Sequence, residues 1–297
     1  MNETILITGY NGALAKRLTS YLKEKYSLVY LSSRKKSVNN KDIFYWNIET
    51  QYIDENVFNN CTHIIHLSGY NIINRWSKKN RRKMYSSRID AANLLFENCK
   101  KYNINLKTFI SASAMGYYGL GAEKEVDENA SPGTDWLANL VVEWESAANR
   151  FKEIGARTVN LRISLMMDEN SGFLKVTMLP LKFGVTSVFF PSDLNYSWIH
   201  IDDLSRFILY SLENKKILGP YNMASPVKQT QFEVIKEIRS CIFKYAFIFP
   251  IPIFVMKIVL GNRSQLIKGG LYLKVDKLLN SGFKLNYTSI SSFLLNK

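Results

Sequence analysis

The chain has 297 residues, a formal net charge of +14, and 46% hydrophobic against 22% charged residues. This length can bury a large core, and the composition is typical of a folded globular protein and excludes a mainly disordered one. Its three cysteines, Cys61, Cys99 and Cys241, are far apart and lack metal-ligand spacing. We therefore expect reduced thiols, no metal site and a cytoplasmic location, and the N-terminus carries no pattern of a secretory signal.

The first predicted elements are a strand, a glycine turn and a helix within the sequence ETILITGYNGALA at residues 3–15. Ile5–Ile7 is a short apolar run of the kind found in a parallel strand buried on both faces. Leucines at helical spacing follow the turn, at positions 14, 18 and 22. The break between the two patterns falls at Thr8 and Gly9.

The glycine turn matches a form of the dinucleotide-binding fingerprint, T-G-x-x-G-x-x-A. Gly9 can adopt backbone angles that other residues avoid, and Gly12 lets the main chain approach a phosphate at the helix N-terminus. Ala15 replaces the third glycine and is still small enough for close packing of helix against strand. The sequence favours a nucleotide site here, and the alternative is a simple tight turn.

The end of the second predicted strand, Leu28–Leu31, discriminates between cofactors. NAD sites usually place a carboxylate there for the ribose 2′-hydroxyl. This strand instead runs into Ser32, Ser33 and Arg34, with Lys35 and Lys36 after them. Because hydroxyls and a guanidinium suit a phosphate, we predict NADP(H) rather than NAD, the alternative being a solvated basic loop.

Strands and helices alternate along the rest of the chain, which predicts an α/β fold with a doubly wound parallel sheet. Further strands are expected at 43–46, 63–67, 108–111 and 159–163, and helices at 13–25, 78–102 and 136–154. After about residue 168 the alternation of predicted strands and helices becomes irregular. We expect a cofactor-binding domain at 1–240, with substrate-facing insertions from about 168, and a small, mainly helical domain at 241–297.

Two segments have an unusual composition. Six basic residues crowd positions 75–83, and they indicate a solvated helix face or, as an alternative, attraction of an acidic or phosphorylated small molecule. Nucleic acid is disfavoured because aromatic residues do not alternate with these basic ones, and Trp76 alone lies among them. Ile242–Leu260 is the most apolar segment, but two lysines and two prolines interrupt it, so no transmembrane segment is expected. We predict a buried helix there, with contact to a membrane surface as the alternative.

Several motifs occur in the order found in one known group. They are the Thr8-Gly9 turn, Leu67-Ser68-Gly69, Ser87-Arg88-Ile89-Asp90, SASAMGYYG at 111–119, Trp144-Glu145-Ser-Ala-Ala148 and SWIHIDDL at 197–204. With them the chain resembles the epimerase-family proteins of the short-chain dehydrogenase/reductase superfamily, over nearly its whole length. The resemblance includes a small C-terminal domain from about 247 to 295.

This resemblance implies a Rossmann domain that binds NADP(H), and it assigns residues to parts of the cofactor. The pyrophosphate residues it implies are Thr8, Gly9, Tyr10, Asn11, Gly12, Ala13 and Leu14. Those implied for the rest of the cofactor are Ser33 and Arg34 at the 2′-phosphate, Asn47 and Ile48 at the adenine, and Leu67, Ser68 and Gly69 on the nicotinamide side.

Catalytic residues are harder to identify. The superfamily's acid/base is a Tyr with a Lys four residues later, and only Tyr21 and Lys25 have that spacing, on the first helix. At the expected place the chain reads DWLANL from position 135, so Trp136 and Leu140 occupy the two positions.

The candidates that remain follow the strand ending at Ser111. Ser113 matches the group's substrate-binding serine, and Tyr117 or Tyr118 offers a phenol. The alternative is that Ser111 and Ser113 only bond to backbone at the sheet edge and that one tyrosine packs against the nicotinamide. The predicted function is an NADP(H)-dependent oxidoreductase or epimerase-like enzyme acting on an unidentified small molecule. The alternative is a non-catalytic NADPH sensor.

Overall fold

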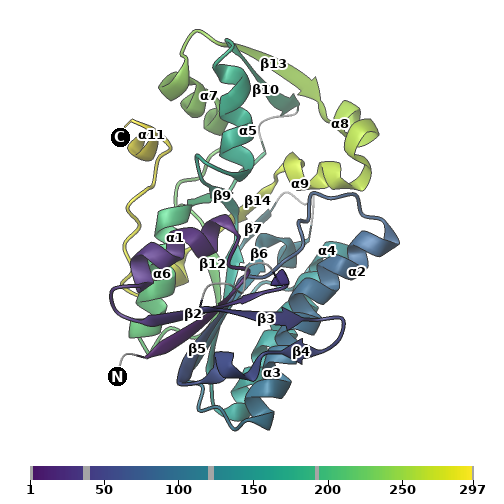
Figure 1. Ribbon diagram of the computed structural model, residues 1–297. Coiled ribbons are helices and arrows are strands. Elements are labelled where there is room, and N and C mark those ends of the chain that lie inside the picture. Colours follow the sequence, from purple (N-terminus) through teal and green to yellow (C-terminus); the bar gives the residue numbers. More distant parts are fainter. Residues whose placement is uncertain (1–2, 36–40, 120–123, 191–193, 296–297) are drawn as a thin grey trace. The chain divides into compact units, whose positions relative to one another are not determined.

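A single mostly parallel sheet organises the chain, for which the computed structural model describes residues 3–35, 41–119, 124–190 and 194–295. Its eight strands run in the order β12-β8-β6-β5-β1-β2-β3-β4 (Figure 1). Their bounds are β1 Thr4–Thr8, β2 Ser27–Ser32, β3 Ile43–Asn47, β4 Tyr52–Ile53, β5 Cys61–His66, β6 Thr108–Ala114, β8 Arg157–Ile163 and β12 Gly219–Met223. The pairs β1–β2, β1–β5, β2–β3 and β5–β6 are parallel, and the short β4 pairs antiparallel with β3.

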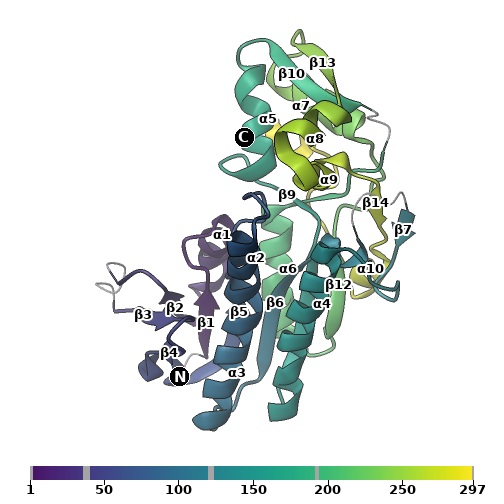
Figure 2. The same cartoon turned by 90° about the vertical axis from the view of Figure 1, so that its right-hand side faces the viewer.

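Helices cover both faces of this sheet, α1 and α6 on one side and α3 and α4 on the other (Figures 1 and 2). Their bounds are α1 Ala13–Leu22, α2 Lys78–Tyr85, α3 Ala91–Lys101, α4 Trp136–Asn149 and α6 Ile201–Glu213. The predicted α/β fold with a doubly wound parallel sheet is thus confirmed.

Two predicted helices are correct in place but not continuous. Between α2 and α3 the chain forms a π turn, Ser86–Asp90, in which the Ala91 N–H donates to the Ser86 carbonyl. The helix expected at 136–154 tightens into a 3₁₀ turn at Arg150–Ile154, which ends at Gly155 with φ of +81°. Hydrophobic periodicity does not register such changes of helix type, because the apolar face continues through them.

The core of the sheet explains why the apolar strands form. Ile5, Leu6 and Ile7 are fully buried, as expected for a central parallel strand. On the α3 side, Phe109 of β6 stacks on Phe151 with ring centroids 3.7 Å apart. The core therefore holds the strand ends in fixed register at both edges of the sheet.

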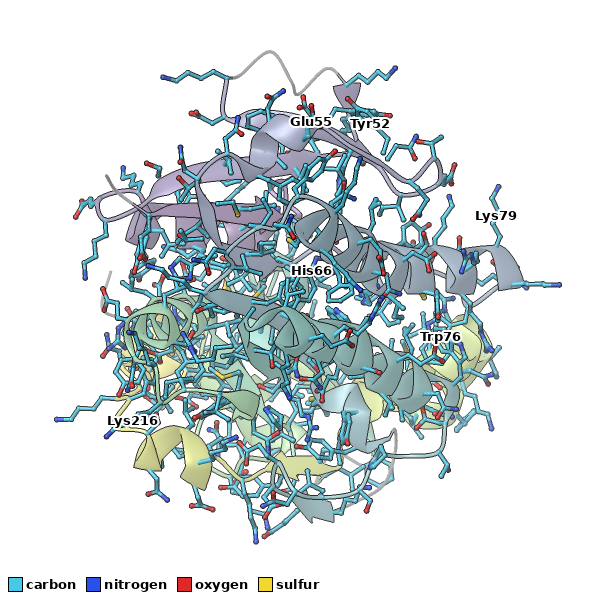
Figure 3. All side chains as sticks on the ribbon, turned by 90° about the horizontal axis from the view of Figure 1, so that it is seen from below. Tyr52, Glu55, His66, Trp76, Lys79 and Lys216 are labelled. Carbon is cyan, nitrogen blue, oxygen red and sulfur yellow. The ribbon has the colours of Figure 1, made fainter. Side chains whose placement is uncertain are left out.

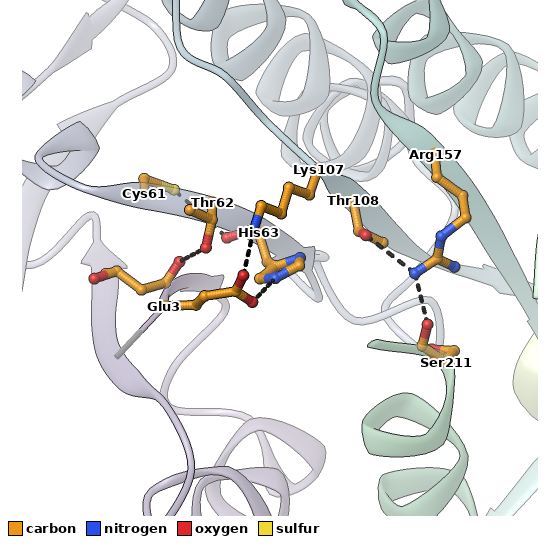
Figure 4. A network of polar contacts seen from close by, with 9 residues as sticks. Glu3, Cys61, Thr62, His63, Lys107, Thr108, Arg157 and Ser211 are labelled. Carbon is orange, nitrogen blue, oxygen red and sulfur yellow. Dashed lines mark hydrogen bonds and ion pairs between the residues drawn. The ribbon is translucent and has the colours of Figure 1, made fainter. Parts of the chain in front are cut away.

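The amino-terminal edge of the sheet is closed by a polar network (Figure 4). One oxygen of Glu3 contacts His63 Nε2 at 2.8 Å, and the other pairs with Lys107. The bond from Lys107 and that from His63 lower the pKa of Glu3. In the same network, Arg157 Nη2 donates to Thr108 Oγ1 at 3.0 Å. These groups are occupied by structural contacts, so the ligand-binding edge has to be sought at the carboxyl ends of the strands.

The chain divides into two compact units that are interleaved along the sequence. The first contains Met1–Ala114, Asn139–Leu161 and Ser205–Pro220, and the second contains Met115–Ala138, Arg162–Leu204 and Tyr221–Lys297. The expected division at 240/241 differs from this, because segments of the second unit begin as early as Met115.

Short parallel strand pairs and helices build the second unit. The pairs are β7 with β14, β9 with β11, and β10 with β13. The bounds are β7 Lys124–Val126, β9 Leu165–Met167, α5 Gly172–Leu181, β10 Val185–Phe190, β11 Trp198–His200, α7 Gln231–Ile242, β13 Phe247–Pro252, α8 Ile253–Leu260, α9 Gln265–Lys268, β14 Leu271–Leu273, α10 Asp276–Asn280 and α11 Ser291–Leu294. The C-terminal region therefore contains strands as well as helices.

The buried helix predicted at Ile242–Leu260 is wrong. That segment contains the strand β13 and the helix α8, and α8 has no buried residue. A segment that is apolar at most positions carries no periodicity that could tell a buried helix from an exposed one. Among the described residues, no helix has both the length and the apolar character needed to cross a membrane.

Candidate functional site

The glycine turn after β1 has the geometry of an anion cradle. Gly9 has φ of +70°, and a Cβ there would lie 2.7 Å from the Leu67 carbonyl oxygen, so only glycine fits. The Gly12 N–H donates to the Gly9 carbonyl at 2.8 Å and closes the turn. No side chain caps the N-terminus of α1, which leaves the N–H groups of Ala13 and Leu14 and the positive end of the helix dipole for a phosphate. The residues present thus fit a pyrophosphate.

Thr8 and His66 fasten this turn to the neighbouring strand end. His66 is fully buried, and its Nε2 lies 3.1 Å from the Arg88 carbonyl, which can only accept, so Nε2 carries the proton. Its Nδ1 therefore accepts from the Thr8 hydroxyl at 3.0 Å. Burial lowers the pKa of His66 to about 4, so the ring is neutral at pH 7. Figure 3 shows His66 among the central elements.

The Thr8 hydroxyl also accepts from the N–H groups of Leu67 and Ser68, at 3.0 and 3.1 Å. Thr8, expected at the pyrophosphate, thus has its donor and acceptor capacity used within the protein. Its side chain sets the position of the loop that follows β5. The sequence contained no signal for this role beyond a histidine at the end of a buried strand.

The loop from Leu67 to Tyr70 is held by the π turn. Ser68 Oγ donates to the Ser87 carbonyl at 2.8 Å, and the Tyr70 N–H donates to Ser87 Oγ at 2.7 Å. Arg88 Nη1 donates to the Tyr70 carbonyl at 3.0 Å. The motif Ser87-Arg88-Ile89-Asp90 therefore positions the loop that contains Ser68 and Gly69.

A groove of about 720 Å³ lies beside these elements within the first unit. Three of its lining residues, Ser33, Asn47 and Ile48, are those expected at the adenosine end of the cofactor. Asn47 Oδ1 accepts from the N–H of Glu49 at 2.9 Å and so shapes the turn after β3. The residues from α2 and the π turn that line the groove are Arg82, Lys83, Ser86, Ser87 and Asp90.

Arg34 is exposed at the end of β2, and its N–H donates to Ser32 Oγ at 3.1 Å. Its side chain is absent from the groove lining, and Lys36 lies outside the described residues. Residues of the basic cluster at 75–83 lie in two different environments. Lys79 points outward (Figure 3), whereas Arg82 reaches the groove and pairs with Asp90 at 2.9 Å.

Ser113, the candidate at the end of β6, is bonded to a buried carboxylate. It is 3% exposed, and its hydroxyl donates to Glu145 Oε1 at 2.6 Å. The neighbouring Trp144 has a buried indole N–H with no hydrogen-bond partner among the described residues, and its ring faces the Arg88 guanidinium at 5.0 Å. Sequence reasoning did not assign Glu145 a role, although it lies in the quoted motif.

The two tyrosine candidates differ sharply. Tyr118 is fully buried, donates to Asn222 Oδ1 at 2.6 Å and accepts from Arg162 Nη1 at 2.9 Å. Burial raises its pKa to about 12. Tyr117 is partly exposed, and the Arg162 guanidinium lies 3.5 Å from its ring centroid. Both tyrosines belong to the second unit, whereas Ser113 and Glu145 belong to the first.

The segment where the superfamily's Tyr-Lys pair is expected has structural contacts here. Asp135 accepts from the N–H groups of Leu137 and Ala138 and so caps α4, and Leu140 is buried. Lys25, which has the right spacing from Tyr21, instead forms an exposed ion pair with Glu213 at 2.6 Å.

Comparison with known proteins agrees with this architecture. The chain is 31% identical over 293 residues to epimerase family protein YfhF of Bacillus subtilis, covering 96% of this chain and 95% of that protein. It is 27% identical over 291 residues to epimerase family protein SAR0825 of Staphylococcus aureus, covering 97% of both.

Solved structures show the same fold. The human epimerase family protein SDR39U1, solved with NADPH, superposes with a TM-score of 0.88 at 24% identity, covering 98% of this chain and 97% of that one. UDP-glucuronic acid 4-epimerase from Bacillus cereus, solved with NAD, gives a TM-score of 0.76 at 18% identity, with 98% and 96% coverage. The sequence model of the NAD dependent epimerase/dehydratase family matches residues 5–224. The chain belongs to this family.

Proposed function

We propose that this protein binds NADP(H) and acts as an oxidoreductase or epimerase-like enzyme on a small molecule in the cytoplasm. The observation that carries the proposal is the cradle formed by Gly9, Gly12 and the uncapped N-terminus of α1. A turn in which the Leu67 carbonyl leaves no room for a Cβ at Gly9, placed before an uncapped helix, is suited to a pyrophosphate.

The preference for the phosphorylated cofactor rests on charge. Ser33 and Arg34 follow β2, and no carboxylate stands at that strand end to repel a 2′-phosphate. Arg82 and Lys83 add positive charge to the groove that Ser33 also lines, although Arg82 is partly neutralised by Asp90. The related human protein, solved with NADPH, supports the same choice.

Ser113 and Tyr117 are the catalytic groups that we propose. Bound NADPH supplies a hydride, and the protein must supply or accept a proton. In hydroxyl oxidation, the Ser113 hydroxyl would accept the substrate proton while its own proton passes to Glu145; in carbonyl reduction, the same path would run in reverse, from a protonated Glu145 through Ser113 to the substrate oxygen. Tyr118 is a weaker candidate than Tyr117, since proton exchange there would break two buried hydrogen bonds.

The substrate class that these groups suit is a small carbonyl or hydroxyl compound, and an acidic or phosphorylated one is favoured. Arg88 is half-buried, and among the described residues no carboxylate pairs with its guanidinium. Burial lowers its pKa to about 10, so it remains charged at neutral pH. A fixed cation beside the Gly69 loop is suited to an anionic group on a ligand.

Calorimetry with NADPH and NADH tests the cofactor assignment. The unmodified protein should bind NADPH at least about tenfold more tightly, a difference of about 1.4 kcal/mol. Arg34→Asp should erase or reverse the preference, whereas Lys23→Asp, at an exposed residue at the C-terminal end of α1, is a control that should leave it unchanged. Equal affinities in the unmodified protein would end the NADP(H) proposal.

A non-catalytic NADPH sensor is the second candidate, and the specific observation that favours it is the loss of the Tyr-Lys pair at Trp136 and Leu140. Cofactor binding does not separate the two functions. Oxidation of bound NADPH on addition of a pool of carbonyl compounds and sugar nucleotides does. Absence of turnover across that pool would favour the sensor.

A further inference from the structure

The second unit carries an unusual concentration of exposed apolar side chains. Twenty large hydrophobic residues are exposed in the part of the chain that the structure describes, and eight of them fall between positions 243 and 260. Five more fall between positions 176 and 190. We call these two segments together the apolar arm.

Strand pairing brings the two segments together. β10 and β13 form a two-stranded parallel sheet in which Val185 pairs with Phe247 and Ser187 with Phe249. The alternate residues face inward, since Thr186 and Val188 are 4% exposed. Phe247 and Phe249 therefore share the outer face, 60% and 50% exposed, with ring centroids 4.5 Å apart.

The helix that follows β13 is apolar apart from Lys257. Its sequence is IFVMKIVL, and none of its residues is buried. Phe254, Ile258 and Val259 are 62%, 80% and 65% exposed. A helix of this composition is normally enclosed by protein or lipid, so its exposure indicates a surface that binds something. In Figure 1, α8 follows at the end of β13.

Charge identifies the partner. From Cys241 to Val275 the chain has five basic residues and no acidic one, and Gly172–Phe190 has two lysines and no acidic residue. Exposed phenylalanines beside lysines and without carboxylates are the composition of segments that lie in the interface of an anionic bilayer. A second copy of the chain would bring the same positive charge to the contact and be repelled.

We propose that the apolar arm docks the protein on the surface of an anionic membrane. Aromatic and aliphatic side chains from β13 and α8 insert at the level of the headgroups, and Lys244 and Lys257 contact lipid phosphates. The docking is peripheral and does not depend on the proposed cofactor or chemistry.

Vesicle sedimentation with the full-length protein tests the proposal. The protein should sediment with vesicles of phosphatidylcholine and phosphatidylglycerol in equal parts, and much less with phosphatidylcholine alone. Lys244→Gln with Lys257→Gln should weaken the anionic binding about 25-fold, because each charge contributes about fivefold. Added salt should weaken it as well.

Phe254→Ser with Ile258→Ser should weaken binding at least about tenfold, because two large side chains no longer insert. The matched control is Leu218→Ser with Leu279→Ser, which removes two exposed leucines outside the arm and should leave binding unchanged. Circular dichroism checks that all variants are folded.

Two outcomes overturn the proposal. One is a lack of sedimentation of the unmodified protein with anionic vesicles. The other is a dimer in solution, seen by light scattering, that the Phe254/Ile258 variant dissociates and the leucine control does not. That result would assign the arm to a second copy of the chain.

Discussion

Acidification is expected to weaken the protein through one buried histidine. In the folded chain the pKa of His66 is lowered to about 4 by burial, against 6.5 for an unperturbed imidazole. Above pH 6.5 both folded and unfolded chains hold this ring neutral, and its contribution to stability is complete. Between pH 6.5 and pH 4 the unfolded chain takes up a proton that the folded chain refuses, so stability falls as pH falls.

The size of the effect follows from the two pKa values. Linkage gives a loss of about 2 kcal/mol in the free energy of unfolding between pH 7 and pH 5 from this group. Protonation would also place a proton on Nδ1, where the Thr8 hydroxyl now donates. The hydrogen bonds by which the Thr8 hydroxyl holds Leu67 and Ser68 would therefore be disrupted when the ring is charged.

Urea unfolding followed by circular dichroism at pH 7 and pH 5 measures this loss. His66→Gln is the matched variant, since an amide can accept from Thr8 and donate to the Arg88 carbonyl but does not titrate in this range. The drop in stability between the two pH values should be about 2 kcal/mol smaller in the variant, because His63 and all other groups remain in both proteins. An equal drop in both proteins would refute the reasoning.

The remaining predictions concern the candidate site. Gly12→Val should abolish NADPH binding by calorimetry with little change in melting temperature, since a Cβ there meets only the Gly9 carbonyl, at 3.1 Å. Once a substrate is found, Ser113→Ala and Tyr117→Phe should each lower kcat by roughly 100-fold with cofactor affinity unchanged, and unchanged rates would place the chemistry elsewhere. Tyr118→Phe should instead lower the free energy of unfolding by about 1–3 kcal/mol in a urea titration, because Asn222 and Arg162 lose a buried partner, while kcat stays near that of the unmodified enzyme.

Much of the fold could be predicted because it rests on local patterns. The strand at Ile5–Ile7 and the glycine turn are encoded within a dozen residues, and the structure has both where the sequence indicates them. The exposure of α8 could not be predicted, since burial depends on what packs against a segment and not on its own composition.

The candidate site shows the same limit. Residue types and motifs pointed to Thr8, Ser68 and Ser113, but their hydrogen bonds join residues 19 to 60 positions apart. Only the folded chain shows that Thr8 serves the loop after β5 and that Ser113 has Glu145 behind it. Long-range pairing of this kind leaves no spacing in the sequence to be read.

The π turn between α2 and α3 also sets how α2 is rotated about its own axis relative to α3. One residue more than an α-helix requires is accommodated there, and each residue of an α-helix turns the chain by about 100°. A single deletion between Ser86 and Asp90 would let α2 and α3 merge into one regular helix and would swing the side chains of α2 by that angle. Arg82 and Lys83 would then leave the groove wall. Whether the groove is positively charged at that side thus depends on the number of residues in one helical turn.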